Sequence, residues 1–549
     1  MKIMIGLLVL VVLLVGTVFS LPFLVDLNKY QDQYKPIIEE TLNRKVQLQD
    51  IRLTVWPRIG ATVAGFAVMD DPSFGLGPFA SLSSLDVGVK LMPLLSGQVE
   101  VEEVTLRNPI ITVIKNKNGV LNASTIGRKG AAVPEAPSKA PIPSAEGPLK
   151  ILALLAVDRV SIDGGKVTYR DQSVAKTTEY VLQDLEVLLR NVRLGQTPNL
   201  HFASLVQPYN MPVKLDGTFG PLKDTMDVEA INFQLSVGKT DFTITGKAVD
   251  HNATVNVSSP VINTANLPIA LPLKKPVEIK NLQIAAEVKG QEAKLNTLSF
   301  GLFDGEVKGS GKLVAGSDAP PFSGGVTIQG LQLGPALSSV ADTPVSVSGT
   351  AGADLSVQGR GFSMPDLTKA LQGTGHVAVK DGKIQGVNIL QEVVSALKVA
   401  GISIDDPKAT VFSTIETDLA IKQGMIKLQN LLMDSHDFQA TGGGTIGFDQ
   451  QLNLLVNLNL SQEVSHKLSG ASPVVKIAMK DGRLSLPLTI TGTAQAPSYG
   501  VDVKGLTGKV QEQVKKKVEE TVGGLLKGTT RPEDLKREGQ ELLKGLFGR

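Results

Sequence analysis

Few residues in this chain have a type and spacing that could do chemistry. There is no cysteine, so disulfides, thiol catalysis and thiolate metal sites are excluded. No histidine has a second histidine three or four residues away, and no HExxH sequence occurs. We therefore predict no metal ion and no cofactor. The five histidines are His201, His251, His376, His436 and His466.

Two glycine-rich segments superficially match phosphate-binding motifs. Residues 442–447 fit GxGxxG, but a dinucleotide loop must open a helix, and here the pattern continues as a strand through Phe448. Gly238-Lys239-Thr240 lacks the upstream glycine of a phosphate loop. No GxSxG nucleophile motif occurs. With 55 basic and 53 acidic residues, the chain also lacks the basic bias that nucleic acid requires. We predict that it is neither an enzyme nor a nucleic-acid-binding protein.

The recurring acidic residues have a structural explanation, because they stand before glycine between alternating apolar runs. Such pairs favour tight hairpin turns, since glycine readily takes a positive φ. We predict turns at Asp163-Gly164, Asp216-Gly217, Asp304-Gly305, Asp381-Gly382, Gln423-Gly424 and Asp481-Gly482.

The elements that these turns join are mostly strands, with apolar residues at every second position. Strands are predicted from Val46 to Val55, at 84–90, 98–106 and 110–115, and repeatedly from 149 to 500. Helical spacing occurs at 29–43, at 389–399 and again beyond 510. The predicted fold class is mainly β, with a few short helices. No fixed repeat length is visible.

So many half-apolar strands must bury one face, and the pattern alone allows tandem β-sandwiches, a barrel or a long open trough. A trough lined by aliphatic side chains would suit acyl chains, which need apolar surface but no directional bonds. The candidates for that lining are Val377, Val379, Leu419, Ile421, Leu452, Leu454, Val456, Leu458, Leu460, Leu484, Leu486, Leu488 and Ile490.

The first residues predict a membrane anchor. Ile3 to Val25 is a run of 23 residues without charge. As a helix it would be about 34 Å long, enough to cross a hydrocarbon core of about 30 Å. A retained anchor is favoured over a cleaved signal because Phe19 to Phe23 is a poor cleavage site. The flanking charges do not settle its orientation.

Composition then divides the remaining chain. Five prolines among Ala, Ser and Lys indicate a semi-extended linker at 127–148, between an N-terminal α+β module (26–126) and a larger β region (149–500). The tail (501–549) is predicted to form basic amphipathic helices. They would cap a sheet edge or touch a membrane surface or a protein partner through Lys515, Lys516, Lys517, Leu542, Leu543, Leu546 and Phe547.

The order of these features resembles the AsmA family of bacterial envelope proteins. The resemblance rests on the anchor, on Leu53–Gly60, Leu91–Gln98, Leu106–Ile111 and Asn118–Asn122, and on Leu371–Gly375 with Asp381-Gly382 through Phe412-Ser413 to the 442–448 bend. Ala123 stands where many members carry Trp. The middle of the chain, about 170–340, resembles the family only in its general pattern of strands and turns.

The resemblance implies an inner-membrane anchor, a periplasmic body and an elongated, curved, taco-like β-groove that holds lipid tails, with an AsmA-like C-terminal part at about 340–500. It further implies a contribution to phospholipid transport between membranes and to outer-membrane biogenesis, with no catalytic residues to transfer. The alternative is a scaffold or assembly factor that affects outer-membrane protein insertion through an envelope protein partner and carries no lipid.

Overall fold

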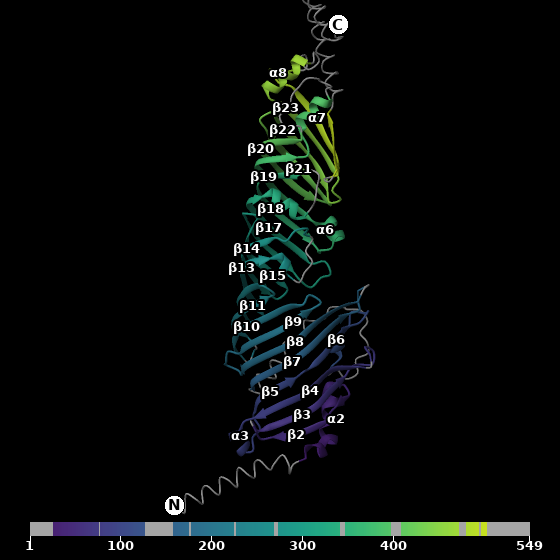
Figure 1. The fold of residues 1–549 in the computed structure, drawn as a ribbon, viewed down its shortest axis with the longest axis vertical. Helices are drawn as coiled ribbons and strands as arrows, with labels where there is room; N and C mark the ends of the chain where they lie inside the picture. Colours follow the sequence, from purple (N-terminus) through teal and green to yellow (C-terminus); the bar gives the residue numbers. More distant parts are fainter. Residues whose placement is uncertain are drawn as a thin grey trace, which may run out of the picture. The chain divides into compact units, whose positions relative to one another are not determined.

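The computed structural model is mainly β, with 25 strands and a few short helices (Figure 1). It describes residues 26–56, 58–75, 77–126, 157–174, 177–223, 225, 227–267, 273–340, 346–396, 408–471, 479–493 and 496–501. Within these residues no helix is both long and apolar enough to cross a membrane. The expected anchor (1–25), the expected linker (127–148) and the tail beyond Val501 lie outside the described residues.

The chain divides into two compact units, one of residues 1–270 with 283–290 and one of residues 271–282 with 291–549. We call them unit 1 and unit 2. The division therefore falls inside the segment 149–500 and not at 127–148. Within unit 1, β7 (Val157–Asp171) pairs in parallel with β5 (Val101–Arg107) and β6 (Ile110–Lys115), which joins the N-terminal module to the strands that follow it.

Unit 1 is a series of thirteen strands, each hydrogen-bonded to a neighbour. Apart from the two parallel pairs, all pairings are antiparallel. The other strands are β1 (Val46–Gln47), β2 (Asp50–Thr54), β3 (Gly60–Met69), β4 (Pro78–Val89), β8 (Thr178–Val192), β9 (Asn199–Gln207), β10 (Met211–Leu222), β11 (Val228–Val237), β12 (Thr240–Val249) and β13 (Asn252–Asn263). Its helices are η1 (Leu27–Tyr30), α2 (Gln31–Leu42), α3 (Leu91–Leu95), η2 (Asn122–Thr125) and η3 (Thr264–Asn266).

Unit 2 is an antiparallel meander in which every strand from β15 to β25 pairs with the next one in sequence. Strand β14 (Glu278–Lys289) lies where the units divide. The others are β15 (Glu292–Leu302), β16 (Gly305–Val314), β17 (Pro321–Gln332), β18 (Ser346–Arg360), β19 (Gln372–Gln385), β20 (Ala409–Lys422), β21 (Met425–Asp434), β22 (Phe438–Gly447), β23 (Leu452–Leu460), β24 (Ser485–Thr493) and β25 (Ala496–Val501).

The helices within the described residues of unit 2 are short and lie between strands. They are α5 (Leu333–Val340), α6 (Met364–Ala370), α7 (Ile389–Ala396) and α8 (Gln462–Ala471). The predictions of helices at 29–43 and 389–399 agree with α2 and α7 in the described residues. The other three helices of unit 2, and α3, were not predicted, because segments of five to ten residues carry too few turns for a helical period to stand out.

Three of the six predicted turns are hairpin turns and three are wrong. Gln423-Gly424 joins β20 to β21 with both residues at positive φ, Asp481-Gly482 turns in the same way, and the turn after β15 lies one residue early, at Phe303-Asp304. The pairs at 163–164, 216–217 and 381–382 lie inside β7, β10 and β19. Gly164 and Asp381 do take positive φ, but there the strand is bent and continues. The 442–447 segment lies within β22, as the sequence predicts.

Candidate functional site

One face of the unit 2 sheet is apolar from its first strand to its last. Paired residues of neighbouring strands point to the same side, so one register row can be followed across the sheet. The row Leu295, Gly311, Gly324, Val357, Gly373, Ile421, Ile426, Ile446 and Leu452 crosses nine strands without a polar side chain. The register partners on this face in β15–β25 include three residues with a hydroxyl group, Thr410, Thr417 and Tyr499. The Thr417 hydroxyl donates to the Gln429 carbonyl at 2.9 Å.

Unit 1 repeats this arrangement. The row Leu189, Leu200, Gly217, Phe233 and Ile244 runs through β8–β12, and Val104 with Val160 extends the same kind of surface across the parallel pair. The opposite face carries Asn, Asp, Lys, Thr and Gln. We call the aliphatic side of each unit its apolar face.

In unit 2 one end of the apolar face is filled. The buried cluster there contains Ala351, Val379, Phe412, Met433, Phe438, Ala440, Val456, Leu458, Leu460, Leu486 and Leu488 from the strands and Leu484 just before β24, with Ile389, Leu390 and Val394 from α7 and Val464 and Leu468 from α8. We call this cluster the sealed end. The helix α7 contacts both β20 and β25. Five strand spacings in a flat sheet would be about 24 Å, twice the length of about 12 Å of an eight-residue helix, so the sheet curls at this end.

Specific hydrogen bonds hold the two covering helices in place. The Ile389 N–H at the start of α7 donates to Thr410 Oγ1 at 3.0 Å, and that hydroxyl donates to the Val387 carbonyl at 3.0 Å. On α8, the fully buried Ser465 accepts the Leu484 N–H through its hydroxyl at 3.0 Å, which ties the helix to the residue before β24. Buried donors at the sealed end are thereby satisfied.

The rest of the apolar face of unit 2 is only partly buried. We call it the open section; it includes Leu295, Leu298, Val326, Leu355, Val377, Leu419, Ile421, Leu428, Leu452, Leu454 and Ile490. None of these side chains belongs to the buried cluster, although Ile490 packs against it. Unit 1 is open to a greater degree, since the buried apolar cluster among its described residues is small and consists of Leu189, Val192 and Leu222. Both units therefore present aliphatic surface that their own described side chains do not fill.

Register shifts separate the sealed end from the open section. In β17 the extra residue lies between Ile328 and Leu331, and in β21 it lies between Leu428 and Leu431, where the pairing with β20 shifts as well. On these strands, the residues on one side of the shift lie toward the sealed end, and the residues on the other side lie toward the open section. A bulge bends its strand and increases its twist, so a line of bulges folds the sheet along its length.

A polar cluster on the opposite face supports this bend. Asn430, at φ 52°, donates from Nδ2 to Asp418 at 2.9 Å, and His376 Nδ1 lies 3.0 Å from the same carboxylate. These hydrogen bonds, first from Asn430 and then from His376, lower the pKa of Asp418. The Asp216 carboxylate similarly lies 2.5 Å from His201 Nδ1 in unit 1, and that contact lowers the pKa of Asp216. Neither pair belongs to a group of three metal-ligating side chains in the part of the chain described.

Glycine lets neighbouring strands approach closely on the curled apolar face. A Cβ added at Gly442 would lie 2.3 Å from the Leu455 carbonyl oxygen and 2.7 Å from the Val456 Cα. Both are backbone atoms, which cannot rotate away. The curl at this point therefore requires a residue without a side chain.

Gly442→Ala is expected to destabilise unit 2 by about 2–3 kcal/mol, because the methyl group must push two strands apart. Urea-dependent proteolysis of the full chain, with unit 2 fragments assigned by mass spectrometry, would measure the shift in midpoint. Gly470→Ala is the matched control, since no atom lies within 4 Å of the Cβ it would add. Equal midpoints for the two variants would contradict the close approach.

The thirteen residues predicted to line a groove share this apolar face, but they divide between its two parts. Val379, Val456, Leu458, Leu460, Leu484, Leu486 and Leu488 are buried at the sealed end, where protein side chains surround them. Val377, Leu419, Ile421, Leu452, Leu454 and Ile490 lie in the open section. Sequence reasoning missed the lining residues of β15–β18. Val326 and Leu355 lie in alternating segments, whereas a register shift interrupts the alternation between Leu295 and Leu298.

Three of the surface depressions of unit 2 measure about 1020, 840 and 740 Å³. The 1020 Å³ depression is lined by Leu295, Val357 and Ile421 of the apolar row together with Lys294, Lys312 and Gln358 of the polar face. The 740 Å³ depression is lined by Val326, Leu355 and Leu419 together with Lys308, Asp354 and His376. The 840 Å³ depression lies at the sealed end, against Phe412 and Phe438. Aliphatic residues of the apolar face therefore line two of these depressions outside the sealed end.

The two units define this chain as a long antiparallel β-sheet protein with one continuous apolar face in each unit. The family comparison agrees with that description. The AsmA family matches at residues 2–268 and 273–431, and the chain belongs to this family. The resemblance inferred from the sequence is thereby confirmed. No curated protein and no solved structure matches the chain.

Proposed function

We propose that this protein is anchored in the bacterial inner membrane by residues 3–25 and holds lipid acyl chains on its apolar faces in the periplasm, contributing without catalysis to phospholipid transport between membranes and to outer-membrane biogenesis. The observation that carries the proposal is the open section. The eleven aliphatic side chains named above lie there only partly covered, and most of the intervening residues on the opposite face are polar.

The chemistry of the lining fits acyl chains and little else. No charged side chain lies among the register partners of this face in β15–β25, so a ligand with polar groups would lose its hydration without gaining hydrogen bonds. A hydrocarbon chain gains about 0.8 kcal/mol for each buried methylene. Selectivity among lipids should be weak, because no directional group reads the head group.

The sealed end gives the lipid path a boundary. Acyl chains reaching it meet side chains that are already packed, with α7 and α8 above them. We infer that lipid occupies the open section and the apolar face of unit 1 and stops at this core.

The alternative, a scaffold for outer-membrane protein insertion, is favoured by the same sealed end. A filled core covered by two helices is what a protein-binding end requires for rigidity. That function needs no lipid on the open section, so a direct test of lipid contact separates the two.

The test places the photocrosslinking residue p-benzoylphenylalanine at position 454 or 453 of the full chain. Leu454 lies in the open section, and the exposed Asn453 lies on the opposite face of the same strand. Because consecutive strand residues point to opposite sides, we expect about tenfold more lipid adduct at 454 than at 453 after irradiation of cells and mass spectrometry. Equal or absent adducts at both positions would exclude lipid carriage by this face and leave the scaffold.

A further inference from the structure

The most exposed large apolar side chains of unit 1 gather on two neighbouring loops. Trp56 is 76% exposed, Met92 75% and Val99 71%, and Leu91 is also exposed. Trp56 lies between β2 and β3, and the other three lie in or after α3, between β4 and β5. We call these two loops, with Trp56, Leu91, Met92 and Val99, the tip.

A backbone hydrogen bond joins the two loops of the tip, since the Val89 N–H donates to the Ile59 carbonyl at 2.9 Å. The Lys90 N–H donates to the Glu100 carbonyl at 2.9 Å and closes the loop that contains α3. Gly60 and Gly88 are register partners just inside the loops. The exposed side chains therefore belong to one structural feature and not to scattered positions.

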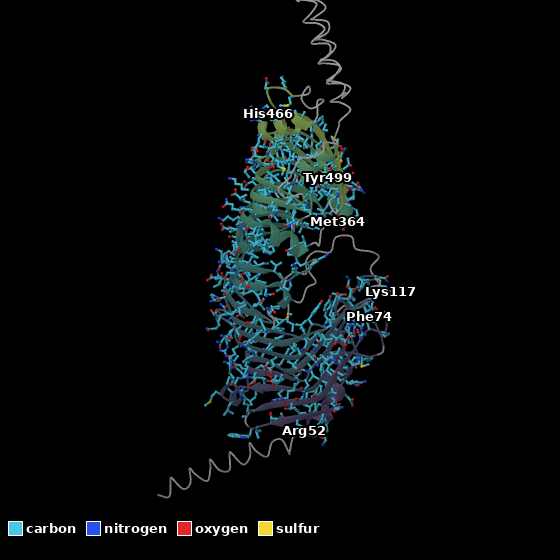
Figure 2. The ribbon with its side chains drawn as sticks, turned by 45° about the horizontal axis from the view of Figure 1, so that its top comes forward. Arg52, Phe74, Lys117, Met364, His466 and Tyr499 are labelled. Atoms are coloured by element: carbon cyan, nitrogen blue, oxygen red, sulfur yellow. The ribbon has the colours of Figure 1, made fainter. Side chains whose placement is uncertain are left out.

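The tip lies near the edge strand β2 of unit 1, at the opposite end of that strand from η1, where the chain leaves toward residues 3–25. Asn28 Nδ2 donates to Asp50 at 2.7 Å, and the Ile51 N–H donates to Asn28 Oδ1 at 2.8 Å, so the start of β2 is fixed beside η1. Trp56 follows the other end of that five-residue strand, about 17 Å away. Figure 1 shows α2, β2 and α3 at the same end of unit 1, and Figure 2 labels Arg52 there.

We propose that the tip inserts into the head-group region of the bilayer that holds residues 3–25. A tryptophan beside leucine and methionine is the combination that prefers a membrane interface, because the indole offers both an apolar ring and an N–H. The apolar run Ile3–Val25 ends next to η1 and would bring this end of unit 1 to a bilayer surface. The inference rests on the proposed anchoring and not on the carriage of lipid.

The contact is apolar rather than electrostatic. Lys90 lies 3.2 Å from Glu100 and 3.5 Å from Asp158, Arg58 is paired with Glu103, and Arg52 is paired with Asp50. Each cation near the tip is therefore balanced by a carboxylate. Insertion should depend little on anionic lipid or on salt, unlike the binding of a basic amphipathic helix.

The test uses Trp56 itself, since the chain contains a single tryptophan. The full chain is reconstituted in phosphatidylcholine vesicles, with or without phosphatidylcholine brominated near the head of its acyl chains. We expect brominated lipid to lower Trp56 emission at least about twofold, as an interfacial indole lies within reach of the bromines. Leu91→Ser with Met92→Ser should remove most of that quenching. Added phosphatidylglycerol or high salt should leave it unchanged.

The matched control moves the tryptophan within unit 1. Trp56→Phe combined with Tyr209→Trp places it at an exposed position between β9 and β10, several strands away from β2. That residue should respond to aqueous acrylamide and not to brominated lipid. If Trp56 behaves in the same way, or if its quenching disappears in high salt, the proposal is wrong. If Trp56 is quenched but no lipid adduct forms at position 454, the membrane contact of the tip stands and lipid carriage is excluded. If adducts form but Trp56 is not quenched, lipid carriage stands and the membrane contact of the tip is excluded.

Discussion

Leu458→Asp is expected to abolish the cooperative folding of unit 2. Leu458 is fully buried in the sealed end, on a strand between β22 and β24. The substitution removes a buried leucine and places a carboxylate among aliphatic side chains, where an unpaired charge costs several kcal/mol in addition to the about 3 kcal/mol lost with the apolar side chain. The sum exceeds about 5 kcal/mol, which is the whole stability of many domains.

Two neighbouring positions supply the controls on the same strand. Asn457→Asp adds the same charge one residue earlier on the exposed face and should change stability by less than about 0.5 kcal/mol. Leu454→Asp lies on the apolar face in the open section and should cost an intermediate amount. Urea-dependent proteolysis of the full chain measures all three. A greater loss at Leu454 than at Leu458 would mean that the sealed end and the open section have been assigned the wrong way round.

This contrast also shows what the sequence could and could not reveal. Alternation placed Leu452 to Leu460 on one face, and the pairing with β22 and β24 agrees. Nothing in the alternation distinguishes Leu454 from Leu458, because burial depends on what packs above them. That cover comes from α7 and α8, and α8 is a ten-residue helix of mixed composition that was not predicted.

The bends of the sheet could not be predicted from the sequence for a related reason. Asp and Gly at positive φ occur both in hairpin turns and in mid-strand bulges. Asp381-Gly382 and Gln423-Gly424 look alike in sequence, yet one lies inside β19 and the other ends β20. The difference is set by the pairing of the neighbouring strands, which is not local. Asn430, at the bulge in β21, carries no distinct sequence signal at all.

The open section leads to the second prediction, which concerns lipid content instead of stability. Leu419 and Leu428 are register partners on β20 and β21 and are both partly exposed. Leu419→Glu with Leu428→Glu should reduce lipid adducts at position 454 at least about tenfold, since two carboxylates next to hydrocarbon either lose hydration or repel the acyl chain. The fold should persist, because the open section already faces solvent and neither residue contributes to the sealed end.

The matched control puts the same two charges on the other face of the same two strands. Ala420→Glu with Gln429→Glu changes the positions next to Leu419 and Leu428, whose side chains point toward the polar face. Lipid adducts should remain at the level of the unmodified chain.

If both double variants lose lipid equally, the added charge acts through the electrostatic field of the whole unit and the open section is not the contact surface. If neither loses it, lipid bound at 454 does not extend across β20 and β21, and a continuous path over the apolar face of unit 2 is excluded. If only Leu419→Glu with Leu428→Glu loses lipid adducts, the hydrocarbon crosses β20 and β21 on the apolar face, at least four strands from the end of the sheet.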